Sequence, residues 1–368
     1  MTKPRILFSV PTRHHVEIAL DELTGLKELG FTCEQFPYAA KDGVSSKLGR
    51  LLVIVQNALS LVKTARGFKP DVIYFNSRLE VLAGIRDFIT ITIFKTLYRS
   101  KVHFAIKSHG SDIEVLNNSK GFFGKMVLPF LKKHISGWLF LSTEEKRKVI
   151  ETGYLDAEKI FVTKNIVRAD HFNTNQAFRS NLGIPEDHQL LLFVGRLIKE
   201  KGIYEVVKAF AQVADQHQES TLIIVGWGTE LDALKTLVKS LKLDSRVIFT
   251  GFIPEAEVVG YYANCDVLVF PTYFPEGFPM ALFNSVAAGM AVITTPTRAA
   301  TDYLTEPDNC LWVEAQNFNN VSGALHKLLQ SAPLMTSMKL NNAAKGVEFS
   351  QNQVAKELSE IISQIIIK

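Results

Sequence analysis

The ten residues Phe193-Val194-Gly195-Arg196-Leu197-Ile198-Lys199-Glu200-Lys201-Gly202 carry the pattern from which the architecture of this chain can be inferred. An apolar strand pattern ends at Val194, a cationic loop follows, and a helical pattern begins at Ile203. This order is typical of parallel α/β sheets, in which ligands bind at the carboxyl ends of the strands. Arg196 and Lys201 are therefore candidates to hold a dianionic diphosphate, Arg bidentately and Lys as a point charge. Taken by itself, the loop fits an exposed basic loop equally well.

Short apolar runs alternate with helical patterns from end to end, which is the signature of βαβ units. The runs are almost continuously apolar, as expected for strands buried on both faces. We therefore predict two Rossmann-like α/β domains, each a doubly wound parallel sheet, facing each other across a cleft. The predicted strands are Arg5–Val10, Asp71–Phe75, Val102–Ile106, Trp138–Leu141, Leu190–Val194, Thr221–Val225, Arg246–Phe249, Val267–Phe270 and Ala291–Thr294.

The domain boundary is expected in residues 165–188, which are rich in Asn, Asp, Arg, Gly and Pro and lack sustained periodicity. Placing it near residue 172 gives an N-terminal domain of residues 1–172, a C-terminal domain of residues 173–345 and a terminal segment of residues 346–368. A helical apolar stripe in that segment should cross back and brace the first domain. The stripe consists of Val354, Leu358, Ile361, Ile362 and Ile365.

Composition argues against several protein classes. The three cysteines, Cys33, Cys265 and Cys310, are far apart and match no zinc spacing, which disfavours a disulfide framework and a metal site. The N-terminus lacks the apolar core and cleavage site of a signal peptide, so we expect a cytoplasmic protein. The uncharged run Gly277 to Thr297 is long enough to span a bilayer, but prolines and polar residues interrupt it. We expect a turn, a buried helix and a buried strand there.

A second stretch, Val267 to Pro279, leads from a predicted strand through the turn Glu276-Gly277-Phe278-Pro279 into a helix. Pro279 suits the first turn of a helix, and Gly277 lets the backbone approach a ligand closely. Free N–H groups at such a helix start can bind phosphate or sugar hydroxyls. Glu276 should point into the same site as Arg196; the alternative is an exposed acid that only favours the helix dipole. Two glycine turns after apolar strands add weaker support, Gly226-Trp227-Gly228 and Gly251-Phe252-Ile253-Pro254.

In combination these motifs resemble those of the family 4 glycosyltransferases, which are retaining enzymes of the GT-B fold. The resemblance covers most of residues 160–345. In the N-terminal half only the layout is similar, with Ser108-His109-Gly110-Ser111-Asp112 and Phe140-Leu141-Ser142 at the expected strand ends. The motifs that carry the resemblance are Gly195-Arg196 with Lys201-Gly202, Gly226-Trp227-Gly228, Gly251-Phe252 and Pro271 to Gly289.

The resemblance implies a role for each of these residues. Arg196 and Lys201 would hold the donor diphosphate, and Glu276 with the backbone of residues 277–280 would hold the transferred sugar. His109 would reach the donor sugar from the N-terminal domain; the alternative is a hydrogen-bonded histidine at a strand end. The catalytic residues would be Glu276, His109, Arg196 and Lys201. The donor-binding residues would be Gly195, Arg196, Lys201, Gly226, Phe252, Ile253, Glu276, Gly277, Phe278, Pro279, Met280 and Asn284, with backbone near Phe252 and Ile253 at the base.

Two departures from the family pattern concern the donor and the acceptor. The family has a second glutamate eight positions after the first, which usually holds the ribose hydroxyls, and this chain has Asn284 there. An amide loses the charge-assisted hydrogen bonds of a carboxylate, so donor affinity or donor type should differ. The first loop, residues 11–15, lacks the common glycine pair. Arg13 or His14 could meet an anionic acceptor, or the loop could simply cap a helix.

The N-terminal half is basic, with 26 Lys and Arg against 17 Asp and Glu in residues 1–170, whereas residues 171–368 have 15 against 20. Between residues 85 and 140 basic residues stand beside large apolar ones, which is typical of a surface that contacts anionic lipid. Lys120 to His134 is the best candidate, although Pro129 should interrupt it. The alternative is a set of core helices with solvated lysines. No nucleic-acid-reading motif accompanies the charge, so we expect no nucleic-acid partner.

The sequence thus predicts a retaining, metal-independent glycosyltransferase of hexosyltransferase type, with no cofactor and a nucleotide-diphosphate sugar as co-substrate. Among the nucleotides we favour a UDP-sugar. The acceptor would be a glycan or a lipid-linked glycan of cell-envelope polysaccharide or glycolipid synthesis, used on the inner face of the membrane. Two alternatives stay open: a nucleotide-sugar epimerase or hydrolase of the same fold, and a non-catalytic nucleotide-sugar-binding protein.

Overall fold

The computed structural model describes residues 3–11, 16–38, 43–44, 46–172 and 174–367, and the chain divides into two compact units. Unit 1 comprises residues 1–166 and 351–368, and unit 2 comprises residues 167–350. The sequence had suggested boundaries at residues 172 and 345. In the structure the units meet at residues 166/167 and 350/351. Within unit 2 the Val167 amide donates to the Phe349 carbonyl at 2.8 Å, which joins the two ends of this unit.

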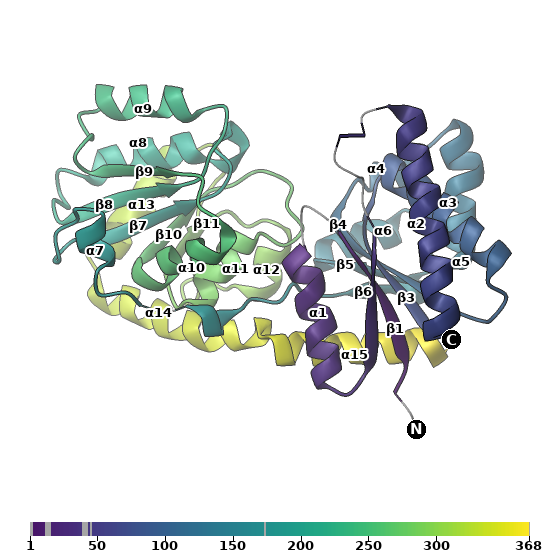
Figure 1. Cartoon of the computed structure of the whole chain (residues 1–368). Helices are drawn as coiled ribbons and strands as arrows, with labels where there is room; N and C mark the ends of the chain where they lie inside the picture. The colour runs from purple at the N-terminus through teal and green to yellow at the C-terminus, as the bar shows by residue number, and fades with distance from the viewer. Residues whose placement is uncertain (1–2, 12–15, 39–42, 45, 173, 368) are drawn as a thin grey trace. The chain divides into compact units, whose positions relative to one another are not determined.

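Unit 1 is built on a parallel sheet that has six strands among the described residues, in the order β2-β1-β3-β4-β5-β6 (Figure 1). The chain runs from β1 to β2 on one side and then crosses to β3 on the other. The point where the strand order reverses therefore lies between β1 and β3. The strands are β1 (Arg5–Val10), β2 (Thr32–Pro37), β3 (Val72–Leu79), β4 (His103–Ser111), β5 (Ile135–Phe140) and β6 (Ile160–Val162).

Helices cover both faces of this sheet, so unit 1 has two core layers. Because side chains alternate along a strand, Leu7 joins the core layer on one face, whereas Ile6 and Phe8 join the layer on the other. The first layer packs under α2 (Lys47–Phe68), α3 (Val81–Leu97), η1 (Phe123–Val127) and α5 (Leu128–His134), and the second under α1 (Val16–Glu28) and α15 (Gln351–Ile367). The remaining helical segments are α4 (Glu114–Asn118), α6 (Thr143–Glu151) and η2 (Ala157–Lys159).

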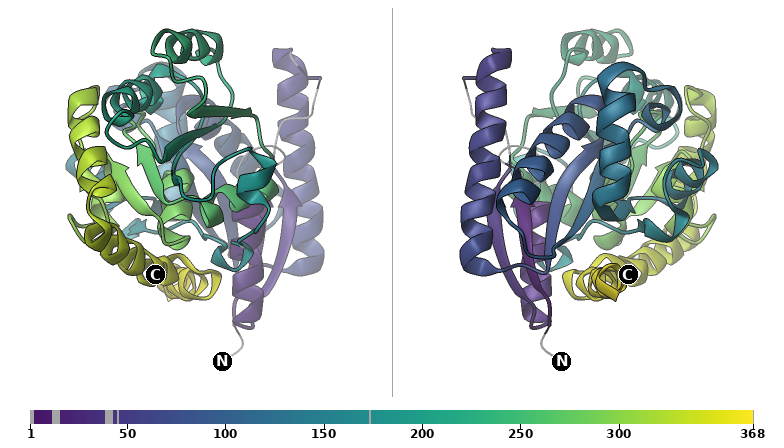
Figure 2. Two further views of the ribbon diagram at one scale, coloured as in Figure 1. Left: turned by 90° about the vertical axis from the view of Figure 1, so that its left-hand side faces the viewer. Right: turned by 90° about the vertical axis from the view of Figure 1, so that its right-hand side faces the viewer.

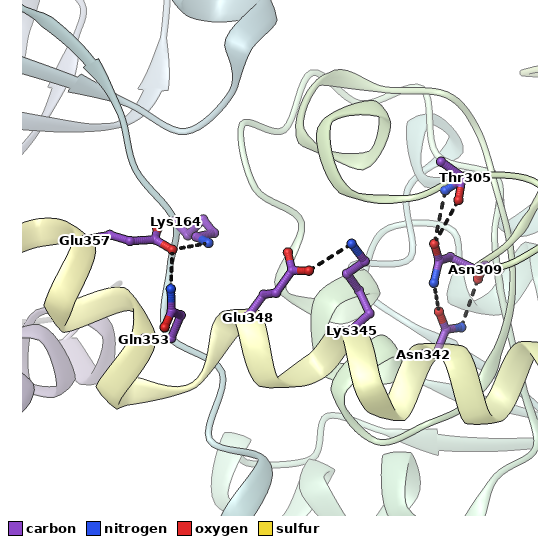
Figure 3. Close-up of polar contacts among 8 residues, drawn as sticks. All are labelled: Lys164, Thr305, Asn309, Asn342, Lys345, Glu348, Gln353 and Glu357. Carbon is purple, nitrogen blue, oxygen red and sulfur yellow. Dashed lines mark hydrogen bonds and ion pairs between the residues drawn. The ribbon is translucent and has the colours of Figure 1, made fainter.

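The terminal helix α15 is part of unit 1, where its apolar stripe is buried against α1 and the sheet. Gly25 of α1 permits this packing, because a Cβ there would lie 2.7 Å from the Cβ of Ala355. One polar contact adds to it, because Glu357 accepts from Lys164 at 2.8 Å; Glu357 also accepts from Gln353 of the same helix at 3.1 Å (Figure 3). A helix remote in sequence thus closes one face of the unit 1 core.

Unit 2 contains a second parallel sheet, with six described strands in the order β12-β11-β10-β7-β8-β9. The chain runs outward from β7 through β9 and then returns to β10, so the strand order reverses between β7 and β10. The strands are β7 (Gln189–Val194), β8 (Ser220–Val225), β9 (Val247–Gly251), β10 (Val267–Phe270), β11 (Ala291–Thr294) and β12 (Leu311–Trp312).

Helices also cover both faces of the unit 2 sheet (Figure 1). Helix α8 (Ile203–Val213) packs beside α13 (Phe318–Leu329), and α11 (Met280–Ala287) packs beside α14 (Ala332–Gly346). Asn342 fixes α14, since its buried amide donates to the carbonyl of Met290 at 2.7 Å. It also donates to the carbonyl of Asn309 at 2.9 Å (Figure 3). The remaining segments are η3 (Ala169–His171), α7 (Phe178–Asn181), η4 (Lys199–Lys201), α9 (Leu231–Ser240), α10 (Glu255–Asn264), α12 (Arg298–Tyr303) and η5 (Val347–Phe349).

The predicted strands all correspond to strands of the two sheets, with ends that shift by a few residues. The uncharged run of residues 277–297 also has the expected course, a turn followed by α11 and β11. The three cysteines are buried and form no disulfide.

For the basic segment of residues 120–134, the prediction that Pro129 interrupts the helix is wrong. Residues 123–127 form a π-helical turn in which the Leu128 amide reaches the Phe123 carbonyl, five residues back, and α5 continues through Pro129. The π-helical turn lies directly before Pro129, so the regular pattern of hydrogen bonds from residue i to residue i−4 is already interrupted where the proline lacks its amide hydrogen. Phe123, Leu128 and Leu131 are buried in the core, while Phe122 and Met126 are exposed.

One helix among the described residues, α2, is long and apolar enough to cross a membrane by length and composition. Its most apolar window of 18 residues has a mean hydropathy of 1.2, and 28% of that window is buried. Figure 2 shows α2 as the long dark helix at the outer edge of unit 1. Most of the surface of α2 is therefore left uncovered by the described residues of this unit.

Candidate active site

The predicted diphosphate-binding residues of unit 2 lie at the carboxyl ends of β7 and β10, where the strand order reverses. Arg196 and Lys201 follow β7, and Glu276 follows β10. The Lys201 ammonium and a carboxylate oxygen of Glu276 form an ion pair. In open α/β sheets this position is the usual ligand site.

Lys201 is held in a largely buried and partly aromatic environment. Its side chain is 8% exposed, and its ammonium lies 4.9 Å from the ring centroid of Phe274 and 5.6 Å from that of Phe270. The guanidinium of Arg196 lies 4.8 Å from the centroid of the same Phe274 ring. Burial and the nearby Arg196 lower the pKa of Lys201, and Glu276 opposes the shift. The site thus concentrates two cations around one aromatic ring.

Backbone contacts hold the two loops of the site together. The Glu200 carbonyl accepts hydrogen bonds from the amides of Tyr273 and Phe274, both at 2.9 Å. Gly202 has a φ of +73°, and a Cβ there would lie 2.3 Å from the Pro271 carbonyl oxygen. Only glycine permits so close an approach, so Gly202 both ends the Lys201 loop and fixes it against the Glu276 loop.

The two glycine turns lie beside the same loop. The Gly195 amide donates to the Val225 carbonyl at 3.0 Å, and a Cβ on Gly226, whose φ is +146°, would lie 1.9 Å from the Gly195 oxygen. The Gly226 amide donates to the Gly251 carbonyl at 2.9 Å, which connects the turn that carries Phe252 and Ile253. The Phe252 side chain is 76% exposed, and Ile253 is half-buried. The structure therefore brings these predicted donor residues to one edge of the sheet.

The turn before α11 contributes backbone rather than side chains. Gly277, Phe278 and Pro279 are buried, and Met280 begins the helix. The Phe278 ring stacks on Phe283, with 3.8 Å between ring centroids. Its side chain thus serves the core, and what the turn can offer a ligand is its backbone and the positive end of a helix.

Asn284, at the position of the family's second glutamate, is half-buried on α11 and forms a side-chain hydrogen bond with Tyr262 of α10. Tyr262 is buried, and burial raises the pKa of its hydroxyl. The sequence analysis missed this tyrosine. Nothing in the local pattern marks it, because Asn284 and Tyr262 lie on different helices and meet only through tertiary packing.

His109 lies in unit 1 on β4, the strand next to β3 in the sheet. Its Nε2 lies 2.8 Å from Oδ1 of Asn76, and the Asn76 amide Nδ2 donates to the Ser9 carbonyl at 3.0 Å. Since Nδ2 is the donor of Asn76, Oδ1 accepts and Nε2 of His109 carries the proton. Asn76 was also missed, although a polar residue directly after the predicted strand Asp71–Phe75 was a usable signal.

The predicted acceptor residues Arg13 and His14 lie outside the described residues. Within the described part of the chain, no group of three or more His, Cys, Asp or Glu side chains could hold a metal ion.

Comparison with known proteins shows similarity to glycosyltransferases. Residues 174–346 match the profile of the family described as Glycosyl transferases group 1. An uncharacterized glycosyltransferase of Methanocaldococcus jannaschii is 28% identical over 221 residues, which are 60% of this chain and 54% of that protein. The chain spans about half the length of the first curated relatives it matches.

Two further similarities are informative. The N-acetylgalactosamine-N,N'-diacetylbacillosaminyl-diphospho-undecaprenol 4-alpha-N-acetylgalactosaminyltransferase of Campylobacter jejuni is 29% identical over 66% of this chain and 64% of its own length. The crystal structure of Anabaena Alr3699/HepE, in complex with UDP and glucose, superposes with a TM-score of 0.74 at 19% identity and covers 98% of this chain and 99% of its own. The chain therefore has the two-domain α/β fold of GT-B glycosyltransferases, and its residues 174–346 are similar to the group 1 glycosyl transferases, which supports the resemblance to family 4.

Proposed function

We propose that this protein transfers a hexose from a nucleotide-diphosphate sugar to a glycan or lipid-linked acceptor. The observation that carries the proposal is the cluster of Arg196, Lys201 and Glu276 at the carboxyl ends of β7 and β10. Two cations there match a diphosphate, and a carboxylate beside them matches sugar hydroxyls.

The ion pair between Lys201 and Glu276 suits an exchange of partners when the donor binds. The diphosphate would take the Lys201 ammonium, and a sugar hydroxyl would take the Glu276 carboxylate. Each buried charge then keeps a partner, which avoids the large cost of leaving one unpaired. Because Glu276 would be engaged in holding the sugar, it is a poor covalent nucleophile.

We therefore favour retention by attack on the same face of the sugar. The acceptor oxygen bonds to the anomeric carbon as the bond from that carbon to the β-phosphate oxygen breaks. The acceptor proton passes to that phosphate oxygen, and the nucleoside diphosphate leaves. Arg196 and Lys201 would stabilise the negative charge on the leaving group, and with them we propose a reaction that needs no metal ion.

The choice of substrates rests on the relatives. The Anabaena structure contains UDP and glucose, which supports a UDP-sugar as the donor. The Campylobacter enzyme is named for a diphospho-undecaprenol acceptor, which supports a lipid-linked glycan in cell-envelope polysaccharide or glycolipid synthesis. With such an acceptor we propose a cytoplasmic protein that works at the inner face of the membrane.

The test is an incubation of the protein with a panel of nucleotide sugars, each with and without a lipid-linked glycan acceptor. We expect transfer with one donor, and only slow loss of that donor when the acceptor is left out. Rapid hydrolysis or epimerisation of the donor alone would instead assign a hydrolase or epimerase. Tight donor binding without turnover on any acceptor would assign a binding protein.

A further inference from the structure

Unit 1 contains a cavity of about 670 Å³ between α2 and α3, separate from the residues discussed so far. This α2–α3 cavity lies within the ~300–1,000 Å³ range of small-molecule sites. Its walls are mainly apolar and include Leu51 and Ile54 of α2 and Leu82, Ile85 and Ile89 of α3. A pocket of this size needs an apolar occupant if its surface is to be removed from water.

The mouth of the cavity is apolar as well. Leu82 is 74% exposed and Leu51 is 43% exposed, although both line the cavity. Single exposed leucines are common on protein surfaces, but exposed leucines that continue into an apolar cavity form one patch, which marks an interaction site.

Charge at the cavity favours an occupant with an anionic group. Lys47, Arg50 and Arg86 line it, whereas Glu80 is the acid among the described lining residues. Lys47 and Arg50 are exposed on the first turn of α2, and within the described residues neither makes an ion pair. Helix α2 itself contains four Lys or Arg and neither Asp nor Glu.

The inner end of the cavity reaches toward the carboxyl edge of the unit 1 sheet. Tyr38, which lines the cavity, directly follows β2, and its hydroxyl donates to Asp87 at 2.5 Å. Asp87 also accepts from Ser77 of β3 at 2.6 Å, and the Arg86 guanidinium donates to the Ser77 hydroxyl at 2.7 Å. Tyr38, Ser77 and Asp87 are buried, whereas the Arg86 side chain is 27% exposed and also forms an ion pair with Asp87 at 2.9 Å. The network thus fixes the Arg86 guanidinium at the edge where ligands of such sheets bind.

We propose that the α2–α3 cavity binds the apolar chain of a lipid phosphate or lipid diphosphate acceptor, with Lys47 and Arg50 at its anionic group. The inference rests on the proposed function, since it specifies which acceptor a glycosyltransferase of this kind would use. It needs an apolar chain and a phosphate on the same molecule, which a free glycan does not offer.

The test is titration calorimetry of the full chain with farnesyl diphosphate below its micellar concentration, without donor. We expect saturable binding that inorganic diphosphate does not displace. Ile54→Trp, which fills the cavity, should weaken binding about tenfold or more. The double variant Lys47→Glu with Arg50→Glu should weaken the binding of farnesyl diphosphate by a similar factor. It should weaken the binding of farnesol much less, because farnesol carries no charge.

Leu59→Trp is the matched control, because Leu59 is exposed on α2 but does not line the cavity. It should leave binding unchanged. Absence of saturable binding, or equal affinity in Ile54→Trp and wild type, would overturn the inference. A third result would also overturn it: the protein associates with phosphatidylglycerol vesicles, Leu59→Glu loses this association and Ile54→Trp keeps it. In that case α2 would contact the membrane surface itself.

A UDP titration of the same preparation separates the two proposals. If UDP binds and farnesyl diphosphate does not, the cavity assignment fails while the proposed function stands. If farnesyl diphosphate binds as described and no nucleotide does, the cavity assignment stands and the proposed function fails.

Discussion

Lys201 illustrates how the surroundings of one side chain set its chemistry. Its ammonium is largely buried, lies near two aromatic rings and pairs with Glu276. Burial disfavours the charged form, so the pKa of Lys201 is lowered from its ordinary value of 10.5. The protonated form is the one that can bind a diphosphate. Loss of the proton must therefore begin at a lower pH than for an exposed lysine.

This lowered pKa predicts an alkaline loss of nucleotide affinity that depends on residue 201. Arginine stays charged at every accessible pH, so in Lys201→Arg the loss should begin at higher pH than in wild type. The measurement is the UDP dissociation constant between pH 7 and about 10 for both proteins, with Lys199→Arg as the control. Titration of the nucleotide is common to all three, so parallel curves for wild type and Lys201→Arg would contradict the prediction.

Asn284 predicts a gain of affinity from a single substitution. Replacing it by glutamate supplies the carboxylate that the family pattern places near the ribose, and a charge-assisted hydrogen bond should strengthen UDP binding by ~1 kcal/mol. Calorimetry with UDP and with 2′-deoxy-UDP measures it, and Asn284→Gln is the control. An equal change for both ligands, or weaker binding of UDP, would show that the bond between Asn284 and Tyr262 serves another purpose.

Residues that follow strands could be predicted from the sequence, and residues that meet through packing could not. Arg196, Lys201 and Glu276 come directly after apolar runs, so their place at the carboxyl edge of a sheet follows from the fold. Tyr262 meets Asn284 across two helices. Its role depends on how α10 and α11 pack, which no local pattern encodes.

Among the elements, the central strands were predictable and three edge strands were not. β2, β6 and β12 each lie at the edge of a sheet, and none was predicted. β2 has two buried residues among its six, and β6 and β12 are only three and two residues long. The continuous apolar pattern that marks a strand buried on both faces is therefore absent from them.

The buried ion pair between α1 and β4 predicts a large effect on unit 1. Lys107 and Glu22 have side chains that are 0% exposed, and their charged atoms lie 2.5 Å apart. Removing one partner leaves the other charge buried, so Glu22→Gln or Lys107→Met should lower the free energy of unfolding by about 3–5 kcal/mol. The double variant Glu22→Leu with Lys107→Met should cost less than the sum of the single changes.

Denaturant unfolding followed by fluorescence measures this effect. Trp138 lies in unit 1, whereas Trp227 and Trp312 lie in unit 2, so Trp227→Phe with Trp312→Phe leaves a reporter for unit 1. Arg147→Ala breaks the exposed pair with Glu151 and should cost at most about 1 kcal/mol. Single variants of the buried pair that cost no more than Arg147→Ala would contradict the prediction.

In the whole molecule, the order of the elements along the chain does not match the division into units, because the last helix belongs to the first unit. Helix α15 ends the sequence but belongs to unit 1, and Ile362 is fully buried in its second core layer. Unit 1 therefore cannot complete its core until α15 is present. The apolar stripe predicted that this helix packs on another element, and in the structure it packs on α1 and the unit 1 sheet.

This arrangement predicts that damage to α15 acts on unit 1. Ile362→Asp buries an unpaired charge and should destabilise unit 1 by about 4 kcal/mol or more, as Trp138 fluorescence would report. Gln364→Asp introduces the same charge at an exposed position of α15 and should have little effect. The unit 2 transition, followed by Trp227 and Trp312, should stay in place. A larger loss of stability in unit 2 than in unit 1 would contradict the assignment of α15 to unit 1.

The donor site of unit 2 is tested most directly by calorimetric titration of UDP into wild type, Arg196→Ala, Lys201→Ala and Lys199→Ala. Arg196→Ala and Lys201→Ala should each weaken binding by ~1.5–3 kcal/mol, the size of a hydrogen bond to a charged group. Lys199→Ala removes a neighbouring exposed cation and should have little effect. If UDP binds with the same affinity to wild type, Arg196→Ala and Lys201→Ala, the nucleotide does not bind at the carboxyl ends of β7 and β10.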